Sequence, residues 1–250
     1  MGAEAEFLRE DGRRFDQIRE LKIELNYIKW AEGSCLVSLG DTRVICTASL
    51  LNTVPAFAKE KGIGWVFAEY SMLPRAVDIR ASRTQGGRSF EIQRIIGRSL
   101  RAVCDLKLLQ ERTLAIDCDV IQADGSTRCA SIIGGFISLF LALYRLWKDG
   151  VFITFPINQF VSAVSCGVVN GVKMVDLTYK EDSSAECDIT VISTSGGYLV
   201  EVHGGVENGG LITKKDFDDL VEMGISANMK FIDIERKVLE PYIKELKLNF

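Results

Sequence analysis

A short polar turn between two apolar segments contains residue types that bind phosphate. It reads ADGSTR and spans residues 123–128, after a predicted strand that begins at Thr113 and before a long apolar helix that ends near Trp147. A strand that breaks at glycine and leads into a helix leaves free backbone N–H groups at the helix start. These donors and the positive end of the helix dipole favour an anion, and phosphate is the usual one.

The residues of this turn strengthen the phosphate interpretation. Gly125 lets the backbone approach a ligand closely, and Ser126 and Thr127 carry hydroxyl donors. Arg128 carries a planar guanidinium whose paired donors match phosphate oxygens. An ordinary N-cap before a buried helix would show the same residues, because Ser and Thr are common caps. The turn by itself leaves a phosphate site and a structural cap both open.

Opposite charges gather in two other segments. Residues 75–101 hold seven arginines and no lysine against two acids, whereas residues 176–188 hold five acids against one lysine. A basic stripe can follow a phosphate backbone, and a tight acidic cluster can hold a divalent cation. Both segments could instead be solvated faces. The exclusive use of arginine favours phosphate contacts, because the guanidinium pairs with phosphate through two donors.

Composition limits the classes of protein that fit. The chain has 250 residues, is 47% hydrophobic and carries a net charge of −4, so it can bury a full core and is not a generally basic DNA binder. The longest apolar run, Ile132 to Tyr144, contains a glycine pair and predicts a core helix, so we expect no membrane partner. The charged residues 1–10 predict a loosely ordered extension without a signal region.

Cysteine and histidine content argues against several kinds of site. The seven cysteines are odd in number and lack CxxC spacing, which disfavours a disulfide framework or zinc site and predicts a cytoplasmic protein. The single histidine, His203, falls late in a strand pattern, and no nucleophile elbow accompanies it. A structural or edge-strand role is therefore the better interpretation of His203.

The pattern of apolar residues predicts an α+β fold in a single domain over residues 1–250. Helical spacing predicts a C-terminal helix from a Thr213–Asp216 capping box to about Leu246, which Pro241 should kink or interrupt. Both halves of the chain run from strands to a helix, which predicts a pseudo-duplicated core. Besides the strand at Thr113, the sequence predicts strands at residues 18–28, 35–39, 43–51, 64–72, 160–169, 172–177, 187–194 and 198–203, a polar loop at 73–87 and an amphipathic helix at 89–105.

Six ordered motifs carry a resemblance to a known family. They are DGRRFDQIR (11–19), AEGSCLVSLGDTRVICTAS (31–49), GWVFAEYSMLPRA (64–76), GGRSFEIQRIIGRSLRAV (86–103), ERTLAIDCDVIQADGSTR (111–128) and EDSSAECDITVI (181–192). With these motifs the chain resembles the ribonuclease PH family of phosphate-dependent exoribonucleases, which trim transfer RNA 3′ ends. The resemblance runs from Asp11 to the C-terminal helix and implies the RNase PH fold and a homohexameric ring, built as a trimer of dimers.

The resemblance implies roles position by position. In the family, inorganic phosphate as co-substrate is held by a Gly-x-Thr-Arg turn and by an arginine of the motif GRxxEIQR, and paired aspartates of EDSxAExD are implicated in metal binding and catalysis. Arginines that follow the motif MLPRA are linked to tRNA binding. The matching residues are Gly125, Ser126, Thr127, Arg128 and Arg88 for phosphate, Asp182 and Asp188 for Mg²⁺ and catalysis, and Arg75, Arg80 and Arg83 for RNA.

These residue types suit phosphorolysis, in which a phosphate nucleophile attacks the terminal phosphodiester. Two anions must meet, so fixed positive charge from Arg88 and Arg128 is needed. Asp182 and Asp188 could hold a magnesium ion, or one of them could be the general acid for the leaving 3′ hydroxyl. The sequence leaves these two roles open.

The chain departs from the family pattern at Ser126, Cys129, residues 133–135 and the Arg83–Arg88 stretch, and two other functions stay open. The phosphate turn has Ser126 where the family has a second glycine, and only four residues separate Arg83 from Arg88 where a longer, lysine-containing stretch is usual. One alternative is a catalytic or structural ring subunit of an exosome-like complex. The other is a small-molecule kinase of a related fold, although the Gly/Ser-rich ATP loop of such kinases is missing here.

Overall fold

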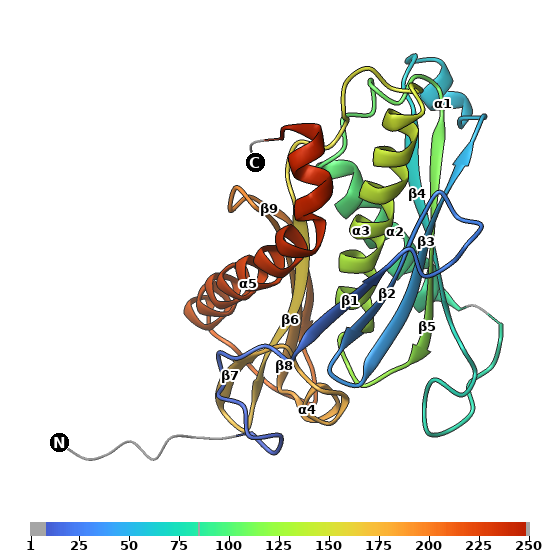
Figure 1. Ribbon diagram of the computed structural model, residues 1–250. Coiled ribbons are helices and arrows are strands. Elements are labelled where there is room, and N and C mark those ends of the chain that lie inside the picture. Colours follow the sequence, from blue (N-terminus) through green and yellow to red (C-terminus); the bar gives the residue numbers. More distant parts are fainter. Residues whose placement is uncertain (1–8, 85, 249–250) are drawn as a thin grey trace.

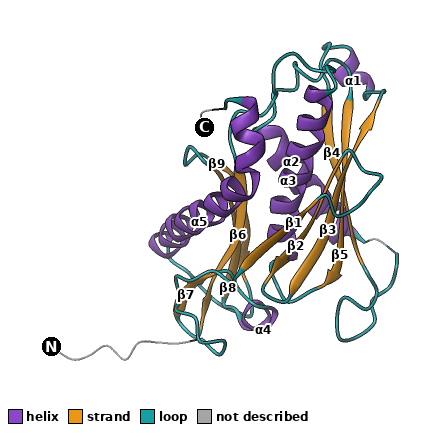
Figure 2. Ribbon diagram, viewed as in Figure 1, coloured by secondary structure: helices purple, strands orange, loops and turns teal. Residues whose placement is uncertain are grey.

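The computed structural model describes residues 9–84 and 86–248, so the expected extension at residues 1–10 lies outside the described residues except for Arg9 and Glu10 (Figure 1). The α+β class is confirmed, with helices packed on two separate sheets (Figure 2). The elements follow the order β1 (Leu21–Leu25), β2 (Gly33–Leu39), β3 (Thr42–Leu51), α1 (Ala56–Lys59), β4 (Trp65–Met72), α2 (Gly87–Ala102), β5 (Thr113–Gln122), α3 (Thr127–Lys148), β6 (Val161–Val169), β7 (Val172–Val175), α4 (Tyr179–Ser184), β8 (Cys187–Thr194), β9 (Leu199–Val206) and α5 (Lys214–Leu246).

The first sheet carries the predicted phosphate turn at one end. Its strand order is β1-β2-β3-β5-β4, and only β4 and β5 run parallel. Alternate residues of β3 are buried, as expected for a sheet with one face on a core. Helix α2 packs on β4, and α3 packs on β2, β3 and β5. The turn between β5 and α3 therefore joins the end of an inner strand to a core helix.

Helix α3 is the central element of the core, and it lies between the first sheet and β6 of the second. The Gly134–Gly135 pair lies inside this continuous helix. A Cβ at Gly134 would lie 2.5 Å from the Cys46 sulfur and 2.8 Å from a Val37 methyl carbon. Glycine is therefore required for close packing there. By length and composition this is the one helix among the described residues that could cross a membrane, longer than the apolar run suggested, but most of it is buried inside the fold.

The second sheet has the strand order β7-β6-β8-β9 and is antiparallel. Helix α5 covers β6 and β8. The predicted hairpin turn at Asn170 and Gly171 is confirmed, since both residues have positive φ, 51° and 73°. The predicted capping box is also confirmed, with the Asp216 N–H donating to the Thr213 hydroxyl oxygen at 3.1 Å. Strand β9 forms an edge of this sheet, which places its residues beside α2.

Three local features differ from the sequence-based expectation. Strand β1 ends early because Asn26 adopts a left-handed φ of 56°. Helices α1 and α4 were not predicted, because four and six residues are too few to show a helical period. Pro241 does not interrupt α5, which continues to Leu246 but bends before its last turns (Figure 1).

Candidate active site

A cleft of about 750 Å³ lies where the starts of α2 and α3, helix α4 and the end of β9 meet. It collects the predicted charged residues from four separate elements, which only the tertiary fold brings together. The residues that line it are Arg88, Arg128, Tyr179, Asp182, Ser183, Asp188 and residues 202–208.

The two arginines of the cleft sit in the first turns of their helices. Arg88 is the second residue of α2 and is exposed, whereas Arg128 is the second residue of α3 and is partly buried. One end nitrogen of the Arg128 guanidinium donates to the Thr190 hydroxyl at 3.0 Å, which fixes the direction of the side chain. Its Nε is buried and has no hydrogen-bond partner among the described residues. A buried N–H without a partner is costly, so this donor is suited to an anionic ligand.

Asp182 and Asp188 both line the cleft, and their like charges repel each other. Asp182 lies in α4 and Asp188 in β8. Burial raises the pKa of Asp182, and the positive charges of Arg88 and Arg128 only partly oppose this shift. Burial raises the pKa of Asp188 as well, with repulsion from Asp182 and Glu207 adding to the effect. The pair therefore holds negative charge that the cleft itself does not neutralise.

This donor set fits Mg²⁺ of the kind that also uses substrate phosphates. Among the described residues no group of three or more His, Cys, Asp or Glu side chains is arranged to enclose a metal ion. Magnesium is commonly held by one or two carboxylates, several waters and phosphate oxygens, rather than by a full protein cage. The uncompensated repulsion between Asp182 and Asp188 is relieved by a cation, so these two residues fit the ion on chemical grounds.

The turn behind the arginines carries the two hydroxyls that the sequence assigns to phosphate. The Ser126 hydroxyl contacts Ser165 Oγ at 2.7 Å and donates to the Leu177 carbonyl at 3.2 Å, so it points into the protein. The Thr127 hydroxyl pairs with the Tyr70 hydroxyl at 3.0 Å. Both hydroxyls have partners within the protein, and the assignment of Ser126 and Thr127 to phosphate binding stays a prediction. What the turn presents is the backbone N–H groups of the first α3 turn.

Gly125 has a structural reason to be glycine. Its φ is +72°, and a Cβ there would lie 2.6 Å from the Leu177 carbonyl oxygen. Ser126 also has a left-handed φ of 53°, which a non-glycine residue adopts only with strain. Gly125 therefore suits the turn, whereas Ser126 is held in a conformation that serine disfavours.

Among the cleft residues that the sequence did not assign to the site, His203 and Glu207 can add charge. His203 lies in the edge strand β9, as predicted, but it also lines the cleft, with Nδ1 3.8 Å from a Glu91 carboxylate oxygen. Glu207 follows β9 and adds negative charge near Asp188. No local motif marks either residue, because only the pairing of β9 with β8 places them beside the aspartates.

The predicted RNA-binding arginines lie outside the cleft, in the loop between β4 and α2 that projects beyond the first sheet (Figure 2). Arg75 donates to the Asp78 carbonyl and so holds the loop to itself. Arg80 and Arg83 are exposed. The segment from Arg83 to Arg88 contains residue 85, which lies outside the described part of the chain.

Comparison with known proteins defines the class. The model of the 3′ exoribonuclease family, domain 1, matches residues 17–144, and that of domain 2 matches residues 159–227. These matches cover most of the chain, so the protein belongs to the 3′ exoribonuclease, or RNase PH, family, which confirms the resemblance. The single-domain organisation over residues 1–250 stays a prediction.

Solved structures share the fold. A chain of the Archaeoglobus fulgidus exosome with RNA bound to the active site is 24% identical with a TM-score of 0.77, covering 90% of this chain and 92% of that one. Rice (Oryza sativa) Rrp46 is 19% identical with a TM-score of 0.74, over 92% and 100% of the two chains. An archaeal exosome core chain is 24% identical with a TM-score of 0.73, over 92% and 90%.

Proposed function

We propose that this protein is a cytoplasmic, phosphorolytic 3′-to-5′ exoribonuclease that shortens RNA, chiefly transfer RNA 3′ ends, and releases nucleoside diphosphates. The observation that carries the proposal is the convergence of Arg88, Arg128, Asp182 and Asp188 on one cleft at the start of α3. Membership of the 3′ exoribonuclease family supports the reaction class. The buried, free state of all seven cysteines is in keeping with a reducing compartment.

The arginines and the α3 start would bind the attacking phosphate. One phosphate oxygen forms a bond to the phosphorus of the terminal phosphodiester, and the bond to the 3′ oxygen of the preceding nucleotide breaks. That oxygen leaves with the electron pair and takes up a proton. Fixed cationic donors stabilise the charge that gathers on the transferring group, because they are already oriented before the reaction. Arg128, whose direction Thr190 sets, is the best placed donor of the cleft.

Asp182 and Asp188 would hold Mg²⁺, which supplies charge neutralisation at the scissile phosphate. Burial is the main cause of the raised pKa of both carboxyls, with repulsion from Asp182 adding to the shift at Asp188, and bound metal would lower both values. A raised pKa also suits a general acid for the leaving 3′ oxygen. In that role, one of the two aspartates would donate a proton to the leaving 3′ oxygen.

RNA contacts outside the cleft would come from the β4–α2 loop. Arg80 and Arg83 are exposed on it, so they are free to approach the phosphates of a bound strand. Removing both should lower the slope of log affinity against log salt by about 1.4, from about 0.7 per phosphate contact on single strands. Arg75→Ala is a weaker test of contact, because Arg75 holds the loop through Asp78.

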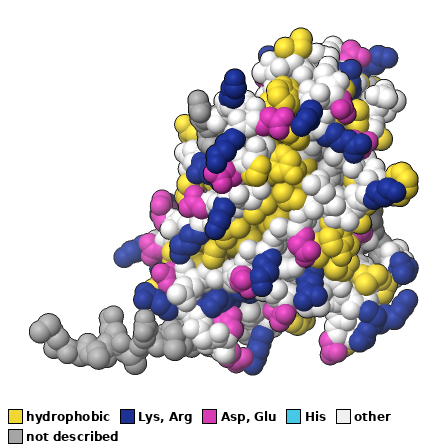
Figure 3. All heavy atoms as spheres, viewed as in Figure 1, with side chains coloured by type: hydrophobic (Ala, Val, Ile, Leu, Met, Phe, Trp, Pro, Cys, Tyr) yellow, Lys and Arg dark blue, Asp and Glu magenta, His cyan; other side chains and the backbone are white. Residues whose placement is uncertain are grey.

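Ring assembly, as a homohexamer, is part of the proposal. Similarity to exosome core chains supports an oligomer, and Figure 3 shows hydrophobic side chains gathered across one face between charged groups. Trp30, at 84% exposed, and Tyr27, at 46%, are large apolar side chains that a partner subunit would cover. Light scattering coupled to size exclusion measures the mass directly, and a monomer at micromolar concentration would contradict the ring.

The deciding experiment uses a tRNA with a short 3′ extension, Mg²⁺, and buffer with or without inorganic phosphate. Stepwise shortening only with phosphate, with nucleoside diphosphates as products, is the expected result. Shortening without phosphate, with monophosphates released, would show hydrolysis and remove the proposed role of Arg88 and Arg128. Lys173→Gln is a matched control, because Lys173 pairs with Asp216 and Asp219 and none of the three lines the cleft.

A second candidate is a ring subunit of an exosome-like complex, and the fold similarity to rice Rrp46 and the archaeal exosome core favours it. The presence of both arginines and both aspartates in one cleft favours a catalytic rather than a purely structural subunit. RNA binding without shortening by the isolated protein would support a structural subunit. Phosphate-dependent shortening of RNA by the isolated protein would exclude a purely structural subunit.

A further inference from the structure

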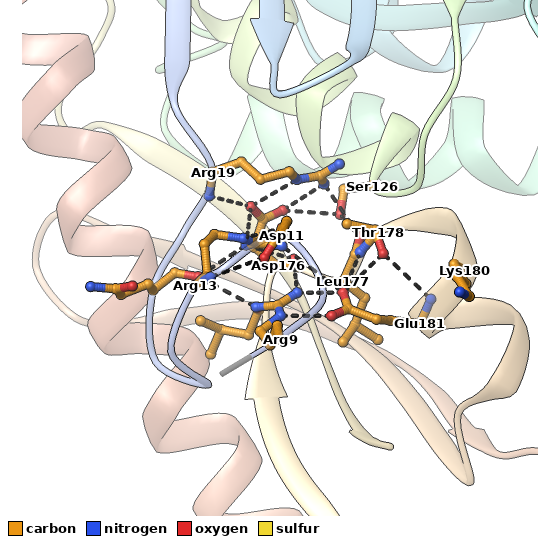
Figure 4. Close-up of polar contacts among 12 residues, drawn as sticks. Arg9, Asp11, Arg13, Arg19, Ser126, Asp176, Leu177, Thr178, Lys180 and Glu181 are labelled. Carbon is orange, nitrogen blue, oxygen red and sulfur yellow. Dashed lines mark hydrogen bonds and ion pairs between the residues drawn. The ribbon is translucent and has the colours of Figure 1, made fainter. Parts of the chain in front are cut away.

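The phosphate turn is held from behind by the beginning of the described chain. We propose that residues 9–19 and the buried Asp176 form a latch that positions both the phosphate turn and the aspartate-bearing helix α4. Arg9, Arg19 and Asp176 are then positioning residues for phosphate binding, an inference that rests on the function proposed above. Within residues 9–19 the latch contacts are made by Arg9, Arg13 and Arg19, and Glu181 is the residue of α4 that Arg9 contacts (Figure 4).

Asp176 is the centre of the latch. It is 0% exposed and has a left-handed φ of 53°, which ends β7. Arg19 donates to its carboxylate from the backbone N–H at 2.7 Å and from Nε and Nη2 at 3.0 and 2.7 Å. Arg13 adds a donor at 3.3 Å. A fully buried carboxylate surrounded in this way is fixed in place, because every alternative orientation leaves a charge unpaired.

The latch reaches the phosphate turn on both sides of Gly125. The single Ser126 O–H is shared between Asp176 Oδ1 at 3.3 Å and the Leu177 carbonyl at 3.2 Å. Arg19 Nη1 donates to the Asp124 carbonyl at 2.5 Å. Gly125 itself packs against the backbone at Leu177, directly after Asp176. The strained conformation of Ser126 is therefore maintained by contacts from the latch, and with it the direction of the first α3 N–H groups.

The same latch reaches the aspartates of the cleft through α4. Arg9 is 5% exposed, and its Nε donates to Glu181 at 2.7 Å while its end nitrogens donate to the carbonyls of Val175 and Asp176 at 2.7 and 2.8 Å. Glu181 completes the capping box at Thr178, the start of α4. Asp182 is the next residue, so a movement of Glu181 would move it.

One segment thus sets the distance between the anion-binding and the acidic sides of the cleft. Preorganised donors bind a phosphate better than donors that must be ordered at binding. Loosening the latch should therefore weaken phosphate binding without removing any group that touches phosphate.

The test measures the binding of inorganic phosphate to the whole protein by calorimetry, alongside steady-state phosphorolysis at saturating RNA. The variants are Asp176→Asn, which keeps the shape of the side chain but removes its charge, and Arg19→Lys, which keeps the charge but loses the two-donor geometry. Lys173→Gln is the matched control, because it removes an ion pair of the adjacent strand β7 with α5 and leaves the turn untouched. All measurements are made well below the unfolding temperature of each variant.

We expect about 10-fold weaker phosphate binding in Asp176→Asn and a smaller loss in Arg19→Lys, seen in the KM for phosphate more than in kcat. Lys173→Gln should bind phosphate as the parent does. Hydrogen exchange at residues 124–129 should rise in the two latch variants, and if Asp176→Asn fails to fold, Arg19→Lys carries the test.

Unchanged phosphate affinity and exchange in folded latch variants would overturn the latch and leave the proposed function standing. An equal loss of phosphate affinity in Lys173→Gln would also overturn the latch, because it would show a general loss of stability. A parent protein that binds no phosphate would instead contradict the proposed function, and increased exchange at residues 124–129 would then still report the latch.

Discussion

The cleft and the latch use the same residue types to opposite effect. In the latch, burial alone would raise the pKa of Asp176, but Arg19 and Arg13 bring its pKa below the usual value. In the cleft, burial raises the pKa of Asp182, and Arg88 and Arg128 do not restore it. The two sites differ in how the arginines reach the carboxylate. Asp176 accepts direct hydrogen bonds from Arg19, whereas Arg88 and Arg128 lower the pKa of Asp182 only by electrostatic attraction without a hydrogen bond.

This contrast separates a structural charge cluster from a binding site. In the latch the Asp176 carboxylate accepts direct hydrogen bonds from Arg19, although Nη2 of Arg13 is also buried without a hydrogen-bond partner among the described residues, 3.9 Å from a Glu181 carboxylate oxygen. In the cleft, the partnerless Nε of Arg128 and the mutual repulsion of Asp182 and Asp188 both leave interactions that a phosphate and a cation would satisfy. Aspartates whose pKa stays raised beside an open arginine donor, rather than an open donor alone, distinguish the cleft from the latch.

The largest effect should come from breaking the latch outright with Asp176→Ala. Removing one partner of a buried ion pair leaves Arg19 uncompensated and should cost about 3–5 kcal/mol in the free energy of unfolding. Urea unfolding at pH 7 measures this. Folding lowers the pKa of Asp176. Its contribution to the free energy of unfolding is therefore present above the pKa of the unfolded chain, about 3.9, and is lost as the pH falls through the pKa of the folded state. The variant and the parent should converge in stability toward that low pH.

Asp188→Asn should separate stability from activity. Activity should fall by about 100-fold or more, because a cation ligand or proton donor is lost. Stability at pH 7 should rise, since the pKa of Asp188 is raised on folding and its ionised form is therefore disfavoured in the native state. Single-turnover assays and thermal unfolding test the two halves, and a loss of stability at pH 7 would contradict the comparison.

Arg128→Lys should have an intermediate effect. The ammonium keeps the charge but loses the contact with Thr190 and the second donor toward phosphate. We expect about a 10-fold rise in the KM for phosphate with RNA affinity unchanged, measured by titrating phosphate at saturating RNA. An unchanged KM would show that charge alone, without the fork, is enough at this position.

The smallest effect concerns Glu235, a buried carboxylate outside both the cleft and the latch. It is 0% exposed in α5, and burial raises its pKa well above the usual value because Arg236 offsets the effect only in part. The parent protein therefore loses stability as the pH rises above the pKa of Glu235 in the unfolded chain, about 4.3. The Glu235→Gln variant should not show this loss of stability. We expect the Tm of the variant to exceed that of the parent by about 2–4 °C at pH 8, with no gain at pH 4. An equal gain at both pH values would show a packing effect instead.

Much of the fold could be predicted from the sequence because its signals are local. The Asn170–Gly171 turn, the capping box at Thr213 and the long apolar helix after the phosphate turn each depend on a few neighbouring residues. Helix α4 and the early end of β1 depend on capping and on single left-handed residues, which leave no periodic signal. Motif order identified the family, because spacing between motifs is also a property of the chain.

The identities of the charged residues were determined by the sequence, but their partners were decided by the tertiary structure. Arg88, Arg128, Asp182 and Asp188 could be named from motifs, and the fold placed them in one cleft. The inward direction of the Ser126 hydroxyl could not be predicted, because its partners on β6 and after β7 are far away in the chain. Whether an arginine completes a buried pair or waits for a ligand depends on burial and distance, and both are set only when distant segments pack together.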